Sequence, residues 1–183
     1  MRIAVLAWGS LVWAPANDHG ELAMAGEWQD DGPQLPVEFA RISSDGRLTL
    51  VIVPGYPHLS RVKWAISALE DLDTAIANLA RRETNAPIHR IHGIGPDGPV
   101  GEPDPATVEA VSAWLAGHSY LDAAIWTGLP PGRRWGPGGW SLEAAIAHLA
   151  GLDEATRARA HEYVDRAPRS VDTPVRRALR GLR

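Results

Sequence analysis

The chain has 183 residues, of which 45% are hydrophobic and 22% charged, and it contains no cysteine. This composition predicts a single globular domain over residues 1–183 and excludes disulfide bonds, thiol catalysis and cysteine metal ligands. The formal net charge of −4 argues against general attraction to nucleic acid. Beyond the N-terminus, no apolar run is long enough to span a bilayer. We expect a cytoplasmic protein that acts on a small molecule or binds a protein, with no nucleic-acid or membrane partner.

The N-terminal stretch at residues 5–13, VLAWGSLVW, has two interpretations. Arg2 followed by an apolar run that ends at residues 14–16, Ala-Pro-Ala, has the outline of a secretory signal. The other interpretation is a buried strand over residues 3–6, followed by a loop at residues 9–11, Gly-Ser-Leu. The glycine of this loop lets the backbone approach a ligand closely because it has no side chain. Two tryptophans and a Gly-Ser break are unusual in a signal core, so we favour the strand.

Several strands are predicted before the first helix. Residues 17–36 are polar and rich in Gly and Asp, which indicates a long surface loop. Two strand-like runs, residues 35–43 and 48–55, are joined at a Ser-Asp-Gly turn in which Gly46 supplies a positive φ, so they predict a hairpin. The alternating segment at residues 61–67 predicts a further strand. At least four strands therefore precede the helix.

Glu38 and Arg41 in the first hairpin strand are secondary candidates for the site. Glu38 shares a strand face with Ala40 and Ile42, and either face of the strand can be the core. If the Glu38 face is the core, Glu38 is a buried carboxylate and a rival base; an edge-strand or solvated glutamate is the alternative. Arg41 can pair with a substrate carboxylate, although a surface arginine is the ordinary interpretation.

The helix predicted over residues 67–84 contains one anomalous position. Ser67 and Glu70 form a capping box at its start. An apolar stripe follows at Leu69, Leu72, Ile76 and Leu79, and the next position in this series is Glu83. A carboxylate on a core-facing stripe loses hydration, which raises its pKa and makes it a better proton acceptor. In the alternative interpretation, the last turn frays and Glu83 faces water or pairs with a neighbouring arginine.

Beyond residue 95 the chain is expected to be mainly helical. His89 and His92 lie three apart in a strand-like segment, which would place them on opposite faces and argues against joint metal ligation. Helices are predicted from Asp104-Pro105 to residue 117, and from near residues 141 and 153. Residues 120–126 are ambiguous between helix and strand.

Two further segments of this half have open roles. The Pro/Gly-rich loop at residues 129–140 suits either a lid over a pocket or a connector. The Arg-rich C-terminus is consistent with a tail that binds nucleic acid or an acidic partner, or with a docked amphipathic helix whose basic face is solvated. Apolar residues at helical spacing, Val175, Leu179 and Leu182, favour the helix.

The order of motifs over about residues 1–95 resembles the gamma-glutamylcyclotransferase-like superfamily. The similarity consists of a first strand ending in an aromatic-Gly-Ser-Leu loop, further strands, and a helix ending in Arg-Glu at residues 82–83. The loop is closest to the glutathione-specific branch. The resemblance implies an α+β fold with a mixed, curled sheet or small β-barrel surrounded by helices. Residues 1–95 would then be a strand-rich core with the motif helix, and residues 96–183 a mainly helical part.

The resemblance also implies an activity and its residues. Trp8, Gly9, Ser10 and Leu11 would bind a gamma-glutamyl group through backbone amides and the serine, and Glu83 would act as acid/base. The substrate's own α-amine would attack its side-chain carbonyl, giving 5-oxoproline and a released amine, with no metal and no cofactor. Trp8 stands where the family usually has tyrosine, which leaves at most an indole donor. A non-catalytic ligand- or protein-binding module on the same fold is the alternative function.

Overall fold

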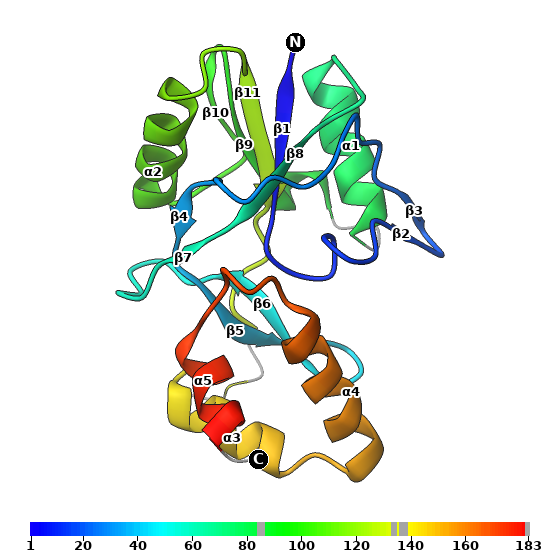
Figure 1. The fold of residues 1–183 in the computed structure, drawn as a ribbon, viewed down its shortest axis with the longest axis vertical. Helices are drawn as coiled ribbons and strands as arrows, with labels where there is room; N and C mark the ends of the chain where they lie inside the picture. Colours follow the sequence, from blue (N-terminus) through cyan, green and yellow to red (C-terminus); the bar gives the residue numbers. More distant parts are fainter. Residues whose placement is uncertain (84–86, 133–134, 136–138, 182–183) are drawn as a thin grey trace.

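The computed structural model describes residues 1–83, 87–132, 135 and 139–181. Figure 1 shows two parts, one built around a mixed sheet and the other around a hairpin surrounded by helices. The strands are β1 (Ile3–Ala7), β2 (Ala16–Asn17), β3 (Gly20–Glu21), β4 (Gln34–Leu35), β5 (Val37–Ile42), β6 (Leu48–Ile52), β7 (Ser60–Arg61), β8 (Lys63–Ile66), β9 (Ile91–Gly95), β10 (Gly98–Val100) and β11 (Ala123–Thr127). The helices are α1 (Leu72–Arg82), α2 (Pro105–Ala116), α3 (Leu142–Ala150), α4 (Glu154–Arg166) and α5 (Pro174–Gly181), with a 3₁₀ turn, η1 (Ile88–Arg90). The expected α+β class with a mixed sheet is confirmed.

The main sheet has five strands in the order β10-β9-β11-β1-β8. β1 runs parallel to β11, and the other neighbours in the sheet are antiparallel. β8 and β10 lie at opposite edges, so this sheet is open, and the expectation of a closed small barrel is wrong. The reason is that β5 and β6 pair with each other in a separate two-stranded sheet instead of closing the main one.

β1 is the buried first strand that the sequence predicts. All five of its residues are buried, because neighbouring strands flank it on both edges and other elements cover both of its faces. Alternate side chains take opposite faces. Ile3 and Val5 join a cluster with α1, whereas Ala4 and Leu6 join the larger core that includes α2 and the hairpin.

The hairpin of β5 and β6 forms the centre of the second part, next to α3, α4 and α5 (Figure 1). Its turn contains Gly46 at φ 86°, as the Asp-Gly signal predicts. Phe39 and Leu48 from the hairpin belong to the same buried cluster as Trp8 and Trp126 from the sheet. One hydrophobic core therefore extends through both parts.

The start of α1 differs from the prediction. Asp71, not Ser67, is the N-cap, and its carboxylate accepts a hydrogen bond from the Thr74 amide at 2.9 Å. Ser67 is still engaged in the strand region, where its amide donates to the Ile3 carbonyl and it forms a bridge with Met24. The capping box at Ser67 and Glu70 is therefore wrong, because sheet pairing extends through the position that the motif assigned to the cap.

The second half of the chain supplies a central strand as well as helices. β11 resolves the ambiguity of residues 120–126 in favour of a strand, and it lies between β1 and β9. The sheet therefore does not divide at residue 95. The starts predicted for the later helices are confirmed, and the side chains of Asp104, Ser141 and Asp153 each accept a backbone hydrogen bond there as the N-cap.

The Pro/Gly-rich loop is tied to the hairpin by two indoles. Trp135 donates to the Ala40 carbonyl at 2.7 Å, and Trp140 donates to the Phe39 carbonyl at 3.3 Å. These contacts fit a connector. Residues 133–134 and 136–138, on which the idea of a lid partly depends, lie outside the described residues.

The Arg-rich C-terminus forms a docked helix, α5, with Val175 and Leu179 buried; Leu182 lies outside the described residues. Its basic face is only partly solvated. Arg176 is buried and donates to four backbone carbonyls between residues 165 and 171. Arg177 is exposed and pairs with Asp172 at 2.9 Å. The helix is therefore fixed in place by buried hydrogen bonds as well as by apolar packing.

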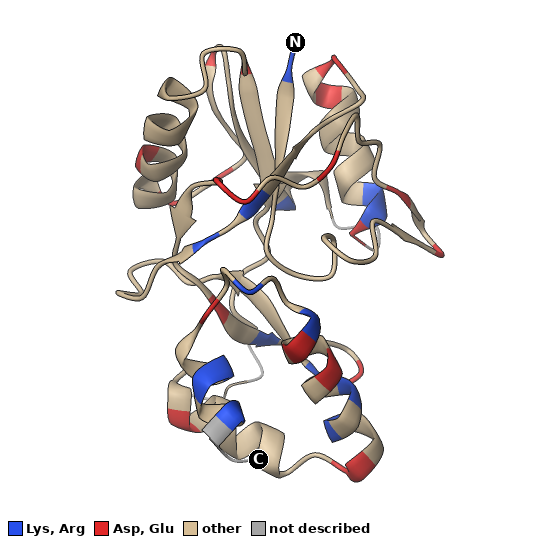
Figure 2. Ribbon diagram, viewed as in Figure 1, with Lys and Arg blue, Asp and Glu red and all other residues tan. Residues whose placement is uncertain are grey.

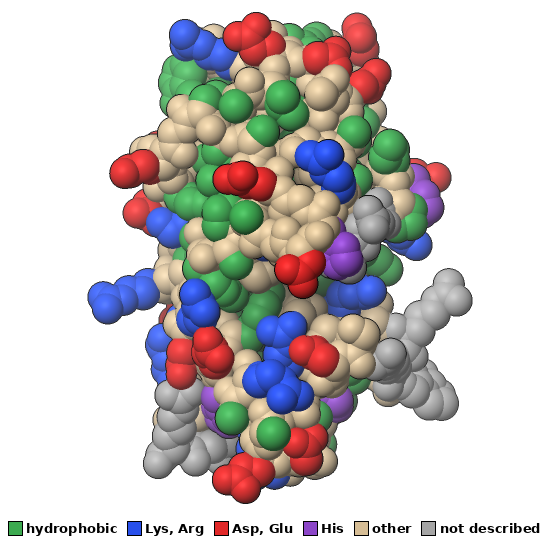
Figure 3. All heavy atoms as spheres, turned by 90° about the vertical axis from the view of Figure 1, so that its right-hand side faces the viewer, with side chains coloured by type: hydrophobic (Ala, Val, Ile, Leu, Met, Phe, Trp, Pro, Cys, Tyr) green, Lys and Arg blue, Asp and Glu red, His purple; other side chains and the backbone are tan. Residues whose placement is uncertain are grey.

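Charged side chains are spread over both parts of the ribbon (Figure 2). On the face shown in Figure 3, the described basic side chains are interspersed with acidic ones. Among the described residues, no helix has both the length and the apolar character needed to cross a membrane.

Candidate functional site

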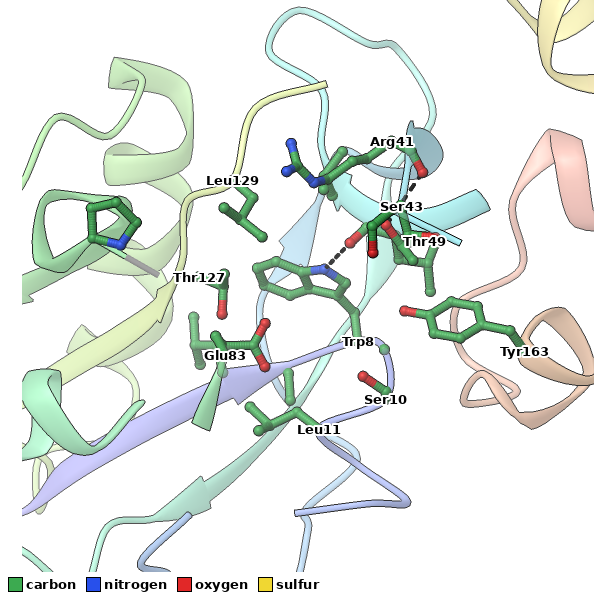
Figure 4. A pocket seen from close by; sticks show the side chains of 17 residues that line it. Trp8, Ser10, Leu11, Arg41, Ser43, Thr49, Glu83, Thr127, Leu129 and Tyr163 are labelled. Atoms are coloured by element: carbon green, nitrogen blue, oxygen red, sulfur yellow. Dashed lines mark hydrogen bonds between the residues drawn. The ribbon is translucent and has the colours of Figure 1, made fainter. Parts of the chain in front are cut away.

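A cavity of about 460 Å³ lies between the two parts of the molecule (Figure 4). It is lined by residues from the end of β1 and the turn after it, from the hairpin, from the C-terminal ends of α1 and β11, and from α4. The volume falls within the range of small-molecule sites. All five residues predicted by the resemblance line this cavity: Trp8, Gly9, Ser10, Leu11 and Glu83.

The segment after β1 is a tight turn. The amide of Val12 donates to the Gly9 carbonyl at 3.0 Å, and the amide of Ala14 donates to the Ser10 carbonyl at 2.8 Å. In this pattern the carbonyls of Gly9 and Ser10 accept hydrogen bonds from later residues of the turn. As in the first turn of a helix, the amides of residues 9–11 have no acceptor within the turn. Of these amides, the Ser10 amide hydrogen-bonds to the Tyr163 hydroxyl, so the amides of Gly9 and Leu11 can bind an anion or an oxygen on which negative charge develops.

Arg82 joins this turn to the end of α1. Its buried guanidinium donates to the Ala14 carbonyl and pairs with the Glu83 carboxylate at 2.5 Å. The Arg82 carbonyl in turn accepts a hydrogen bond from the Asn17 side chain at 2.8 Å. This one residue therefore fixes the position of Glu83 relative to the turn. The sequence suggested that a neighbouring arginine could pair with Glu83, but it did not indicate the hydrogen bond from Arg82 to the Ala14 carbonyl.

Glu83 is the C-cap of α1, and its amide still donates to the Leu79 carbonyl at 3.0 Å. Its side chain is 18% exposed. Burial raises the pKa of this carboxyl, and the Arg82 charge opposes the rise. Parts of both interpretations of Glu83 hold, since the carboxylate is largely desolvated at the cavity and also pairs with a neighbouring arginine.

Trp8 does not offer its indole N–H to a ligand. This group donates to the Leu50 carbonyl at 3.2 Å, and only 5% of the residue is exposed. The indole instead forms an apolar wall of the cavity (Figure 4). The indole donor suggested for this position is therefore already used within the fold.

Tyr163 is a residue of the cavity that the sequence did not reveal. It lies on α4, is buried, and extends its hydroxyl toward the turn after β1 (Figure 4). A Cβ atom placed on Gly9 would lie 2.6 Å from this oxygen. Burial raises the pKa of Tyr163, as does the charge of Glu83. No motif surrounds Tyr163, so only the packing of α4 against the hairpin brings it to the site.

Of the two secondary candidates, Arg41 lines the cavity and Glu38 is not among its lining residues. Arg41 donates to the Pro130 carbonyl at 3.3 Å. Glu38 is fully buried, and its carboxylate accepts hydrogen bonds from the amides of Phe39 at 2.7 Å and Val175 at 3.4 Å. Burial raises the pKa of Glu38, while these bonds and one from Thr173 lower it. The expectation of a solvated Glu38 is wrong, because this side chain holds the first turn of α5.

The two histidines do not share a strand. His89 lies in η1 and His92 in β9, and both line a second cavity of about 390 Å³ with Glu102 and Asp104. The argument from opposite strand faces therefore does not apply to them. Within the ranges that the structure describes, no group of three or more His, Cys, Asp or Glu side chains is arranged to hold a metal ion.

Comparison of the chain with protein-family models, with curated protein sequences and with solved structures gave no match.

Proposed function

We propose that the protein is a gamma-glutamylcyclotransferase-like enzyme, a lyase or transferase that converts a gamma-glutamyl amine or peptide into 5-oxoproline and the free amine, as in glutathione metabolism. The observation that carries the proposal is that the turn at Gly9–Leu11 and the desolvated Glu83 line one cavity of ligand size. Intramolecular lactam formation needs a folded substrate chain, a proton acceptor and donors to the carbonyl oxygen.

In the proposed reaction, Glu83 accepts a proton from the substrate ammonium and so frees the lone pair of the amine. The amine attacks the side-chain carbonyl, a carbon–nitrogen bond forms, and the carbonyl electron pair moves onto oxygen. The surplus proton on the new ring nitrogen passes to water. The old carbon–nitrogen bond then breaks, the electron pair returns to the carbonyl, and Glu83 gives its proton to the leaving nitrogen. A raised pKa suits this exchange, because the acceptor must also become a donor.

Arg41 is the residue we propose for binding a substrate carboxylate. Of the two secondary candidates, Arg41 lines the cavity and Glu38 does not. Figure 4 shows the Arg41 guanidinium on the side of Leu129. A guanidinium binds a carboxylate through two parallel hydrogen bonds, which also orients the bound chain. Fixing the chain is the main requirement for an intramolecular attack.

The test is to incubate the protein with glutathione, gamma-glutamyl-alanine and other gamma-glutamyl peptides and amines, and to measure 5-oxoproline by liquid chromatography and mass spectrometry. The proposal expects turnover of at least one compound. Binding of the same compounds, measured by calorimetry, without any 5-oxoproline would contradict the enzyme and favour the non-catalytic binding module. Neither binding nor turnover would overturn both.

A further inference from the structure

The side chain of Tyr163 is held in one orientation by its neighbours. Its ring packs edge-on against Trp13 at 5.2 Å and against Phe39 at 6.2 Å between ring centroids. The guanidinium of Arg47 lies 5.6 Å from the centre of the same ring. These contacts leave the ring little freedom to turn away, so the hydroxyl is pre-positioned at the cavity before any ligand binds.

The hydroxyl oxygen lies directly against the backbone of Gly9. A Cβ at this position would come within 2.6 Å of the oxygen, whereas the next atoms, Tyr163 Cζ and Leu50 Cβ, would be 3.7 and 3.9 Å away. The backbone groups of Leu50 and Ser10 hydrogen-bond to the phenol and lower its pKa, which means that they donate to its oxygen. The oxygen is thus an acceptor within the fold, and its own proton is available for an acceptor elsewhere.

This phenol stays protonated in the neutral range. Burial and the charge of Glu83 both raise the pKa of Tyr163 above its ordinary value, and the two backbone hydrogen bonds offset only part of this rise. A protonated phenol that accepts from two amides is polarised toward donating its proton in a hydrogen bond. The Trp8 indole N–H already donates to the Leu50 carbonyl, so it is not available to a ligand. Tyr163 therefore supplies the side-chain donor beside the turn.

We propose that Tyr163 is a catalytic hydrogen-bond donor, whose hydroxyl binds the substrate carbonyl oxygen as negative charge develops on it. The inference rests on the proposed function and deepens it, because it assigns a role to α4, which lies outside the region of family resemblance. Tyr163 keeps its proton throughout: the oxygen accepts a hydrogen bond while the amine attacks, and it releases this bond when the carbonyl reforms. A donor that is fixed in advance stabilises the charge without reorganising.

The kinetic test is Tyr163→Phe, with Tyr120→Phe as the matched control, because Tyr120 is 47% exposed and does not line the cavity. Glutathione and gamma-glutamyl-alanine are the probes, and kcat and KM are measured separately. We expect Tyr163→Phe to lower kcat by about 10²-fold, the scale for one oxyanion donor, with KM changed less than about threefold. Tyr120→Phe should leave both constants unchanged.

A kcat for Tyr163→Phe within twofold of the wild type would overturn the inference and leave Tyr163 a packing residue. A higher kcat would also overturn it, because the hydroxyl would then be obstructing the site. If the folded wild-type protein forms 5-oxoproline from none of the gamma-glutamyl peptides and amines of the panel, the proposed function itself fails. The two failures are distinguished by whether the wild type is active.

A second measurement does not depend on the stability of the Phe variant. The chain has three tyrosines, so Tyr56→Phe and Tyr120→Phe identify the remaining signal when the ring Cζ carbons are labelled with ¹³C. Titration of the wild type with the product 5-oxoproline should shift the Tyr163 signal, because the ligand carbonyl accepts a hydrogen bond from the Tyr163 hydroxyl. An unchanged Tyr163 signal at saturation would contradict the proposed contact.

Discussion

Gly9→Ala is expected to destabilise the protein because the added methyl group would clash with one atom, the hydroxyl oxygen of Tyr163. Gly9 does not have a positive φ, so alanine introduces no backbone strain. The added methyl group would lie 2.6 Å from the oxygen, well inside ordinary contact, while Trp13 and Phe39 restrict the retreat of the ring. Overpacking of this kind costs about 1–3 kcal/mol of the free energy of unfolding.

In the background of Tyr163→Phe the same change should be tolerated. The nearest atoms are then 3.7 and 3.9 Å away, which is ordinary van der Waals contact. Alanine also restricts the unfolded chain, which stabilises by about 0.4–1 kcal/mol where the conformation is compatible. The two substitutions should therefore show a coupling energy of at least about 1 kcal/mol in a double-mutant cycle.

The assay is denaturant unfolding of the wild type, both single variants and the double variant, followed by tryptophan fluorescence. Gly26→Ala is the control, because a Cβ at Gly26 would meet nothing within 4 Å. Additivity of Gly9→Ala and Tyr163→Phe within about 0.5 kcal/mol would refute the reasoning, since the hydroxyl would then not contact the turn.

Three further predictions concern α1 and the cavity. Burial raises the pKa of Glu83, so the folded chain binds this proton more tightly than the unfolded chain, and stability falls as the pH rises above about 4.5. Glu83→Gln should thus gain stability over the wild type at pH 7 and lose this gain below pH 4.5, and a gain that grows on acidification would contradict the sign. Asp71→Ala should lower the thermal midpoint of unfolding because it removes the N-cap of α1, whereas Glu70→Ala should not. Equal decreases in the two midpoints would instead support the capping box of Ser67 and Glu70. Arg41→Met should raise KM for gamma-glutamyl peptides about 10–100-fold with little change in kcat, and an unchanged KM would exclude carboxylate binding.

Much of the fold could be predicted from local chemistry. The caps at Asp104, Ser141 and Asp153 and the hairpin turn at Gly46 depend on side chains and backbone within a few residues, so the sequence carries them. The capping box at Ser67 failed because that residue also has a long-range partner, the Ile3 carbonyl, which keeps it in the sheet. Local signals cannot rank such competing uses of one residue.

The barrel expectation failed for a related reason. The strand patterns of β5 and β6 predict a hairpin but do not say which edge the hairpin joins. In the structure, β5 and β6 pair with each other and with no other named strand, and they pack with the C-terminal helices. The centre of the main sheet is occupied by β11, which comes from far along the chain. Topology here depends on contacts between distant segments.

The candidate site was likewise predictable only in part. The Gly9 turn and Glu83 stand out as short motifs, and both line the cavity. Tyr163 and the role of Arg82 come from tertiary packing. Glu38 shows the same limit, because the amide that it binds belongs to Val175, 137 residues away. A strand alternation pattern contains no information about such a partner.

The rate of 5-oxoproline formation by the wild type, Glu83→Gln and Glu38→Gln tests the central claim most directly. Glutamine has nearly the volume of glutamate and can still accept from Arg82, but it cannot act as a base at neutral pH. The proposal predicts that Glu83→Gln lowers kcat by about 10²–10⁴-fold while gamma-glutamyl ligand binding changes far less, and that folded Glu38→Gln keeps kcat within about threefold of the wild type. Turnover that is indifferent to Glu83→Gln but abolished in folded Glu38→Gln would contradict it.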